Sequence, residues 1–114
     1  MAARLPGRLR KGAEFDTVFD RGTASSGPLF VVRVLPRPEG ELRVGYAVGK
    51  RLFPKSTDRN RVRRRLREAV RAAELPDGAD VIVVARGAAA TAPFSELVAS
   101  VRRELDRATR RRTE

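Results

Sequence analysis

The chain has 114 residues, of which 25 are Lys or Arg and 14 are Asp or Glu, so its formal net charge is +11. It contains no cysteine and no histidine, which excludes disulfides, thiolate or imidazole zinc sites, a cysteine nucleophile and a histidine general base. This composition favours one domain that binds a polyanion over an enzyme with its own catalytic residues.

The first part of the chain predicts a basic arm and a short helix. Residues 1–11 are basic and without periodicity, so we expect an irregular arm. Residues 12–21 place Phe15, Val18 and Phe19 on one helical face, and Gly22 is a candidate left-handed cap. The next residues, 23–28, are typical of a turn with a possible short edge strand.

Two strands are predicted next. Residues 29–35 are rich in β-branched side chains, and residues 41–49 alternate, with Tyr46 on the larger-residue face and Gly45 on the other. Since Pro36, Pro38 and Gly40 lie between the strands, we expect them to form a hairpin.

The second half predicts helix, strand, helix. Residues 50–57 form a basic loop, and a helix follows over 58–74 with the apolar stripe Val62, Leu66, Ala69, Val70 and Ala73. Residues 80–86 read as a strand buried on both faces. A last helix is expected over 92–108, inside a single domain of residues 12–108, and a flexible basic tail over 109–114. The fold class is therefore α+β.

Nothing in the sequence predicts a membrane protein. The longest apolar runs, Leu29–Val32 and Val81–Ala85, are far shorter than the roughly 20 residues of a spanning helix. Residues 1–12 do not resemble a signal peptide, so we expect a cytoplasmic protein.

The positive charge is concentrated in one segment. Residues 50–71 carry ten basic and two acidic side chains, whereas residues 12–49 and 72–101 are both slightly acidic. On a helical projection of residues 58–74, a cationic face lies opposite the apolar stripe: Asn60, Arg63, Arg64, Arg67 and Arg71, flanked by Arg61 and Arg65. Guanidinium groups match phosphate oxygens and stack on bases, so this face indicates RNA binding. A lipid-binding helix would expose bulky apolar residues instead.

Other candidate sites are weaker. Glu14, Asp16 and Asp20 could suggest a metal site, but a solvated acidic face is the preferred interpretation, and no residue identifies a metal ligand. Tyr46, the only tyrosine, is interpreted as a core residue rather than a catalytic one.

Four ordered segments resemble the bacterial ribonuclease P protein component. RNRVRRRLREAVR, residues 59–71, resembles the signature helix of that family. RLRKGAEFDTVFDRG (8–22), ELRVGYAVGKR (41–51) and DVIVVAR (80–86) resemble its first helix, its strand with the basic loop, and its late strand. The resemblance covers roughly residues 4–107.

The resemblance implies a fold and a function. The fold is a two-layer α/β sandwich, ribosomal protein S5 domain 2-like, with a mixed central sheet and a left-handed strand–helix–strand crossover, whereas a generic crossover would be right-handed. The protein would bind the catalytic RNA subunit of ribonuclease P and the 5′ leader of precursor tRNA. That RNA would perform the endonucleolytic hydrolysis and hold most of the magnesium. The protein alone would not be catalytic, and no obligate protein partner is evident.

The resemblance also assigns residues. The RNA subunit is expected to contact the basic loop and the signature helix, through Lys50, Arg51, Arg59, Asn60, Arg61, Arg63, Arg64, Arg67 and Arg71. A leader-binding cleft is expected to include Phe15, Phe19, Arg33 and Arg43. Arg33 stands where the family often has an aromatic residue, which favours a phosphate contact over stacking there. Core packing is the alternative for the two phenylalanines.

Two other functions stay open at this point. The chain could be a structural RNA-binding protein, like a small ribosomal protein, that recognises no leader. It could also be a stand-alone metal-dependent nuclease, for which the sequence offers no convincing carboxylate cluster.

Overall fold

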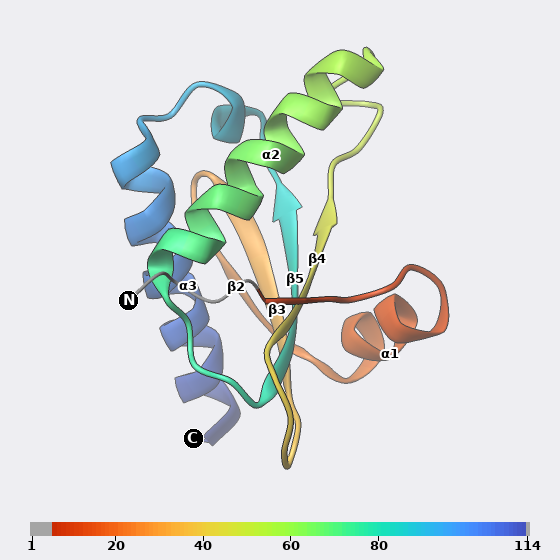
Figure 1. Ribbon diagram of the computed structural model, residues 1–114, viewed down its shortest axis with the longest axis vertical. Coiled ribbons are helices and arrows are strands. Elements are labelled where there is room, and N and C mark those ends of the chain that lie inside the picture. The colour runs from red at the N-terminus through yellow and green to blue at the C-terminus, as the bar shows by residue number, and fades with distance from the viewer. Residues whose placement is uncertain (1–5, 114) are drawn as a thin grey trace.

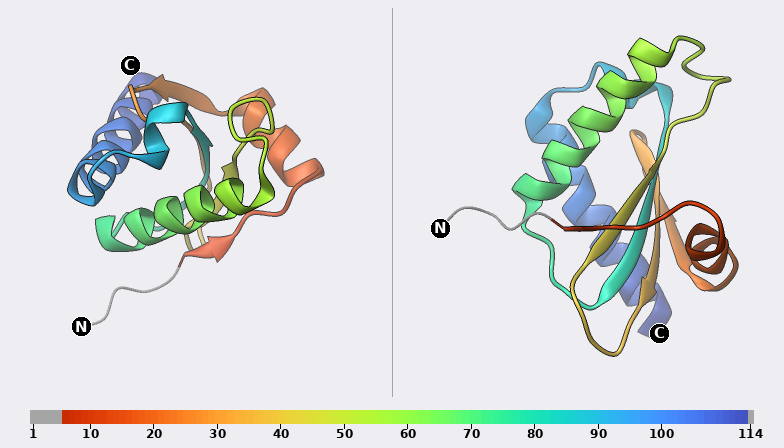
Figure 2. Two further views of the ribbon diagram at one scale, coloured as in Figure 1. Left: turned by 90° about the horizontal axis from the view of Figure 1, so that it is seen from above. Right: turned by 45° about the vertical axis from the view of Figure 1, so that its right-hand side comes forward.

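A five-stranded sheet forms the centre of the computed structural model, which describes residues 6–113 (Figure 1). The strand order is β1-β4-β5-β3-β2. Helices α2 and α3 cover one face, and α1 covers part of the other (Figure 2). The elements in chain order are β1 (Gly7–Arg8), α1 (Ala13–Arg21), β2 (Thr23–Ser26), β3 (Phe30–Pro36), β4 (Arg43–Ala47), α2 (Ser56–Ala73), β5 (Ala79–Ala85), the 3₁₀ turn η1 (Gly87–Ala90) and α3 (Phe94–Thr113).

The predicted hairpin is wrong, because β5 lies between β3 and β4. It pairs antiparallel with β3 and parallel with β4, so the two strands that were expected to pair share no ladder. The reason is hydrophobic burial: the run Val81–Val84 has apolar side chains on both faces, and only a central position covers both. Residues 36–42 therefore form a connection between non-adjacent strands, not a hairpin turn.

The β4–α2–β5 crossover is left-handed. In Figure 1 both strands run upward, α2 passes in front of the sheet, and β5 lies to the left of β4. About 98% of such crossovers are right-handed. The fold implied by the resemblance, with its mixed sheet and unusual crossover, is confirmed.

Several predicted boundaries move. Gly22 is not left-handed but extended, with φ of −76°; a Cβ there would lie 2.4 Å from the carbonyl oxygen of Val18, so close approach explains the glycine. Part of the arm is ordered, since β1 pairs with β4. The last helix continues through the predicted tail to Thr113. Residues 1–5 of the arm and residue 114 of the tail lie outside the described residues.

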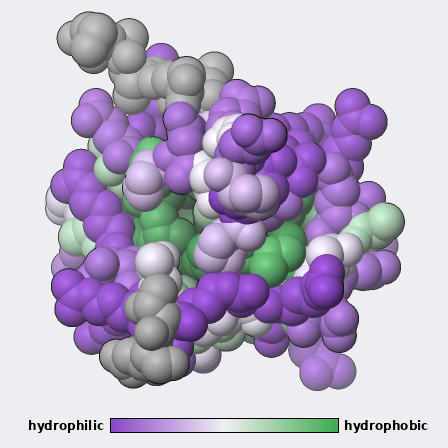
Figure 3. All heavy atoms as spheres, turned by 90° about the horizontal axis from the view of Figure 1, so that it is seen from below, coloured by the Kyte–Doolittle hydropathy of each residue, from purple (hydrophilic) through white to green (hydrophobic). Residues whose placement is uncertain are grey.

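Two apolar clusters hold the layers together. The larger lies between the sheet and the α2–α3 pair and includes Phe30, Leu66 and Leu97, all fully buried. The smaller joins α1 to the sheet through Leu9, Val18 and Ile82. Seen from below, apolar residues also reach the surface at one end of the molecule, surrounded by hydrophilic ones (Figure 3). No helix of the described residues is long and apolar enough to span a bilayer.

Candidate nucleic-acid interface

The outward face of α2 is a continuous cationic surface. Its apolar stripe is buried, which places the polar positions predicted from the sequence on the outside. No salt bridge within residues 6–113 involves an α2 arginine, so this face keeps its charge. A helix of 18 residues extends over about 27 Å. We call the following exposed residues the α2 cationic face: Asn60, Arg61, Arg64, Arg67 and Arg71.

Three other α2 arginines make contacts within the protein. Arg65 turns inward, where its Nη1 donates to the carbonyl oxygen of Ala89 at 2.7 Å and its Nη2 to that of Ala92. Arg59, predicted to bind RNA, is half-buried and its Nη1 donates to the carbonyl oxygens of Phe53 and Pro54 at 2.9 and 2.8 Å.

Arg63, also predicted to bind RNA, is half-buried and donates to Oδ1 of Asn60 at 3.1 Å. These contacts hold Asn60 and the loop before α2 in fixed positions. Donors that remain on Arg59 and Arg63 can still reach a ligand, because a guanidinium carries five N–H groups.

The basic loop extends the α2 cationic face at the helix N-terminus. Lys50 and Arg51, predicted to contact the RNA subunit, are exposed. Phe53 anchors the loop in the core with 8% exposure, whereas the neighbouring Leu52 is 53% exposed. The loop therefore presents two cations and one apolar side chain on a fixed base.

A second group of predicted residues gathers on the opposite face of the sheet, on α1 and the neighbouring strand β3. The Phe15 and Phe19 ring centroids lie 6.4 Å apart, and the guanidinium carbon of Arg33 lies 5.1 Å from the Phe19 ring centroid. Nη1 of Arg33 also donates to the Phe19 carbonyl oxygen at 3.0 Å. We call Phe15, Phe19 and Arg33 the aromatic surface.

The aromatic surface combines packing and exposure. Phe15 lies directly on the backbone of Gly45, where an added Cβ would lie 2.4 Å from two of its ring carbons. Phe19 is 41% exposed, too much for a core residue. Core packing thus describes Phe15 in part, while Phe19 and Arg33 offer a π face and a cation to solvent.

Arg43, predicted to bind the leader, is engaged by carboxylates within the protein. Its Nε and Nη2 donate to the two oxygens of Asp80 at 2.8 and 2.7 Å, and its Nη1 donates to Glu14 at 2.9 Å. The hydrogen bond to Asp80 raises the pKa of Arg43 above its ordinary value, against the opposing effect of burial. Since Glu14 belongs to α1, this network joins α1 to the sheet and sets where the aromatic surface lies.

Of the solvated acidic face expected on α1, Glu14 departs because it is partly buried and ion-paired, whereas Tyr46 lies at the core as expected. Glu14 pairs with Arg43, while Asp16 and Asp20 are exposed, and the described residues contain no group of three or more carboxylates placed to hold a metal ion. Tyr46 packs against the main core, where burial raises the pKa of its hydroxyl in spite of the nearby charge of Arg67.

Comparisons with known proteins agree with this arrangement. The family model described as Ribonuclease P matches residues 6–109. The ribonuclease P protein component of Brucella suis is 39% identical over 93% of this chain and 82% of its own length, and that of Dehalococcoides mccartyi is 37% identical over 89% and 83%. The RNase P protein of Thermotoga maritima superposes with a TM-score of 0.75, at 26% identity, covering 90% of this chain and 96% of that one. The RNase P protein of Staphylococcus aureus superposes with a TM-score of 0.71 at 27% sequence identity, covering 87% of this chain and 92% of that one. With its α2 cationic face, its left-handed crossover and these relatives, the chain belongs to the ribonuclease P protein component family.

Proposed function

We propose that this chain is the protein subunit of the ribonuclease P ribonucleoprotein in the cytoplasm. It binds the catalytic RNA, and that RNA removes the 5′ leader of precursor tRNA. The observation that carries the proposal is the α2 cationic face, because exposed, unneutralised arginines are aligned along one side of a rigid helix. Arginine is suited to phosphate contacts because its planar fork can donate two hydrogen bonds to one phosphate group.

The aromatic surface is the part that supports leader recognition. Unpaired nucleotides bind to exposed aromatic faces and to cations that follow the backbone, with each stacked base contributing about 1–3 kcal/mol. Phe19 is 41% exposed, and the guanidinium of Arg33 lies over its ring. A leader nucleotide would therefore meet the uncovered part of the ring beside a cation. Membership of the family makes the leader of precursor tRNA the single strand to test.

The protein supplies binding and the RNA supplies the chemistry. Histidine and cysteine are missing from the sequence, and the described carboxylates are paired, buried or apart rather than clustered. We therefore place the magnesium ions on the RNA and give no protein residue a catalytic role. The arginines lower the electrostatic repulsion between RNA subunit and substrate, which reduces the magnesium needed for binding.

Reconstitution tests the whole proposal. Adding the purified chain to its cognate RNA at low magnesium should increase the rate of precursor-tRNA cleavage. No increase would overturn the proposal, and cleavage by repurified, RNA-free protein would instead identify a stand-alone nuclease.

Leader recognition needs its own measurement. With the RNA subunit present, affinity for precursor tRNA should exceed affinity for tRNA that lacks the leader, and Phe19→Ala should reduce the difference. Phe94→Ala is the matched control, because Phe94 is similarly exposed, 45% against 41%, but lies on α3 across the sheet. Equal affinities in the parent protein would favour a structural RNA-binding protein.

A further inference from the structure

A second row of arginines runs along the C-terminal half of α3. Arg103, Arg107, Arg110 and Arg111 follow the spacing that places side chains on one side of a helix. The first three side chains are 45%, 56% and 74% exposed. The row covers about 12 Å of helix length. We call these four residues the α3 row.

The α3 row lies beside the edge strand β2. Arg111 Nη1 donates to the carbonyl oxygen of Ala24 at 2.9 Å, and the adjacent Arg112 donates to the carbonyl oxygen of Arg21 at 2.9 Å. Because these acceptors are neutral, the contacts fix the two guanidinium groups without neutralising them. A fixed cation loses less conformational entropy when it binds a ligand.

Carboxylates offset only part of this charge. Glu104 is fully buried beneath the row, where Ser25 Oγ donates to it at 2.7 Å and its oxygens lie 3.2 Å from Arg103 and 3.7 Å from Arg107. Asp106 lies 3.2 Å from Arg110. Within residues 6–113, Glu104 and Asp106 are the carboxylates that pair with arginines of the α3 row.

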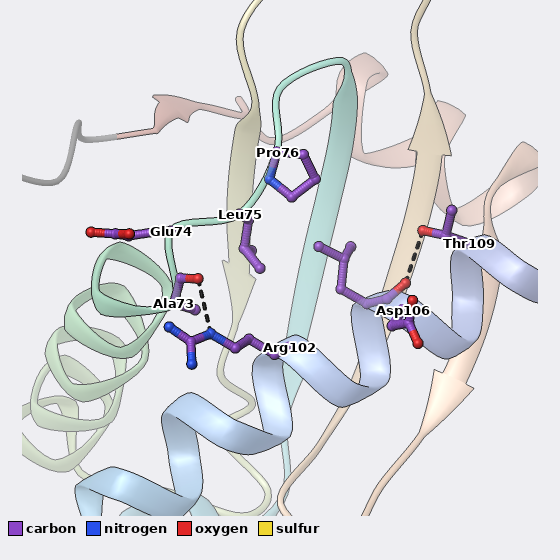
Figure 4. Close-up of a pocket in the computed structure, with 8 residues that line it drawn as sticks. Ala73, Glu74, Leu75, Pro76, Arg102, Asp106 and Thr109 are labelled. Carbon is purple, nitrogen blue, oxygen red and sulfur yellow. Dashed lines mark hydrogen bonds between the residues drawn. The ribbon is translucent and has the colours of Figure 1, made fainter.

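The α3 row is separate from the α2 cationic face. Between them, at the C-terminal end of α2, lies a groove of about 380 Å³ (Figure 4). Leu75 and Pro76 line it from the chain that follows α2, and Leu105 lines it from α3. Its lining also includes the guanidinium of Arg102, which donates to the carbonyl oxygens of Ala73 and Ala72, and the carboxylates of Glu74 and Asp106, so charges of both signs separate the two surfaces. A polyanion bound along α2 would have to cross this groove and its two carboxylates to reach the α3 row.

We propose that the α3 row is a second phosphate-binding surface, which contacts an RNA segment other than the one held by α2. The inference rests on the proposed function for the identity of the polyanion. It extends that function because the protein would then contact two parts of the RNA at once, one on each side of the groove. The arginines can supply direct contacts, since a guanidinium carries five N–H donors and matches the oxygens of a phosphate group.

The salt dependence of RNA binding tests the proposal. Affinity of the full chain for the catalytic RNA is measured between 50 and 200 mM salt for the parent, for Arg107→Gln/Arg110→Gln, and for Arg107→Lys/Arg110→Lys. Each lost phosphate contact lowers the logarithmic salt slope by about 0.7–0.9. Two lost contacts change the salt response over this fourfold range by about tenfold. The factor by which affinity falls between 50 and 200 mM salt should thus be about tenfold smaller for the glutamine variant than for the parent. The lysine variant, which keeps both charges, should retain most of the parental slope.

Two further arms separate this proposal from the proposed function. Arg64→Gln removes a charge from the α2 cationic face and so tests the first surface. If the two surfaces act independently, its reduction of the salt slope should add to that of the glutamine variant. A parental slope in the glutamine variant, with a reduced slope in Arg64→Gln, overturns the second surface alone. Absence of RNA binding by the parent protein overturns both. Thermal unfolding confirms that each variant is folded, and an equal loss of slope in the lysine variant would also overturn a charge-based contact.

Discussion

Replacing Gly45 by alanine should destabilise the fold by displacing Phe15. The added Cβ would lie 2.4 Å from two carbons of the Phe15 ring, whereas carbon atoms in contact are ordinarily about 3.5–4.0 Å apart. The ring therefore has to retreat by more than about 1 Å. Because Phe15 and Phe19 are neighbours on α1, the substitution should also weaken binding of the leader.

The expected size follows from this overlap. Overpacking of a well-filled site costs about 1–3 kcal/mol. In a domain of this size, each kcal/mol lowers Tm by about 4 °C, so the variant should unfold about 4–12 °C below the parent. Gly49→Ala is the matched control, since a Cβ at that position meets nothing within 4 Å and should change the unfolding free energy by less than about 0.5 kcal/mol.

A double-mutant cycle identifies the cause. In a Phe15→Ala background the ring carbons are gone, and Gly45→Ala should then cost much less than it does in the parent protein. Thermal or urea unfolding of the four proteins gives the coupling energy. A parental Tm for Gly45→Ala, or strictly additive losses, would refute the argument that Phe15 rests on the glycine backbone.

Three more predictions concern side chains inside the fold. Burial of Glu104 is outweighed by its hydrogen bonds and ion pairs, which hold its pKa below the ordinary value. The parent should therefore be more stable than Glu104→Gln at neutral pH, and this difference in unfolding free energy should disappear as pH falls through the lowered pKa. A pH-independent difference in urea unfolding would contradict this. Arg65→Gln should lower Tm but leave the salt slope of RNA binding unchanged, because Arg65 bonds within the protein. Arg64→Gln should leave Tm unchanged but reduce the salt slope, because Arg64 is exposed. Identical behaviour of the two variants would exclude different roles. Arg43→Ala should cost about 2 kcal/mol, because Asp80, with 8% side-chain exposure, loses its bidentate partner but keeps Arg37 at 3.3 Å; urea unfolding with a loss below about 0.5 kcal/mol would show that the network is weak.

The helix that carries the α2 cationic face could be predicted from sequence because one periodicity decides both of its faces. Burying Val62 and Leu66 places Arg64 and Arg67 on the outside. The two faces of β4 were predictable for the same reason, since successive side chains point to opposite sides of a strand. Local patterns of this kind need no knowledge of the partner element.

Strand pairing and ion pairing could not be predicted in this way. The hairpin expectation came from a short turn, but the register depends on β5, which begins at Ala79, far along the chain. Arg43 is engaged because pairing between β4 and β5 places Asp80 opposite it. The sequence around β5, an apolar run that follows Asp80, indicates a buried strand. It does not indicate which strands pair with it.

The position of β5 also governs when this chain can fold. Since β3 and β4 are joined in the sheet only by pairing with β5, a chain that has emerged as far as residue 78 cannot assemble the order β4-β5-β3-β2. By then all of α2 has been synthesised, with its arginines present and its apolar stripe uncovered. Early, local hairpin formation is replaced by the closure of a long loop, which slows folding and makes the arrival of one late strand the decisive event during synthesis.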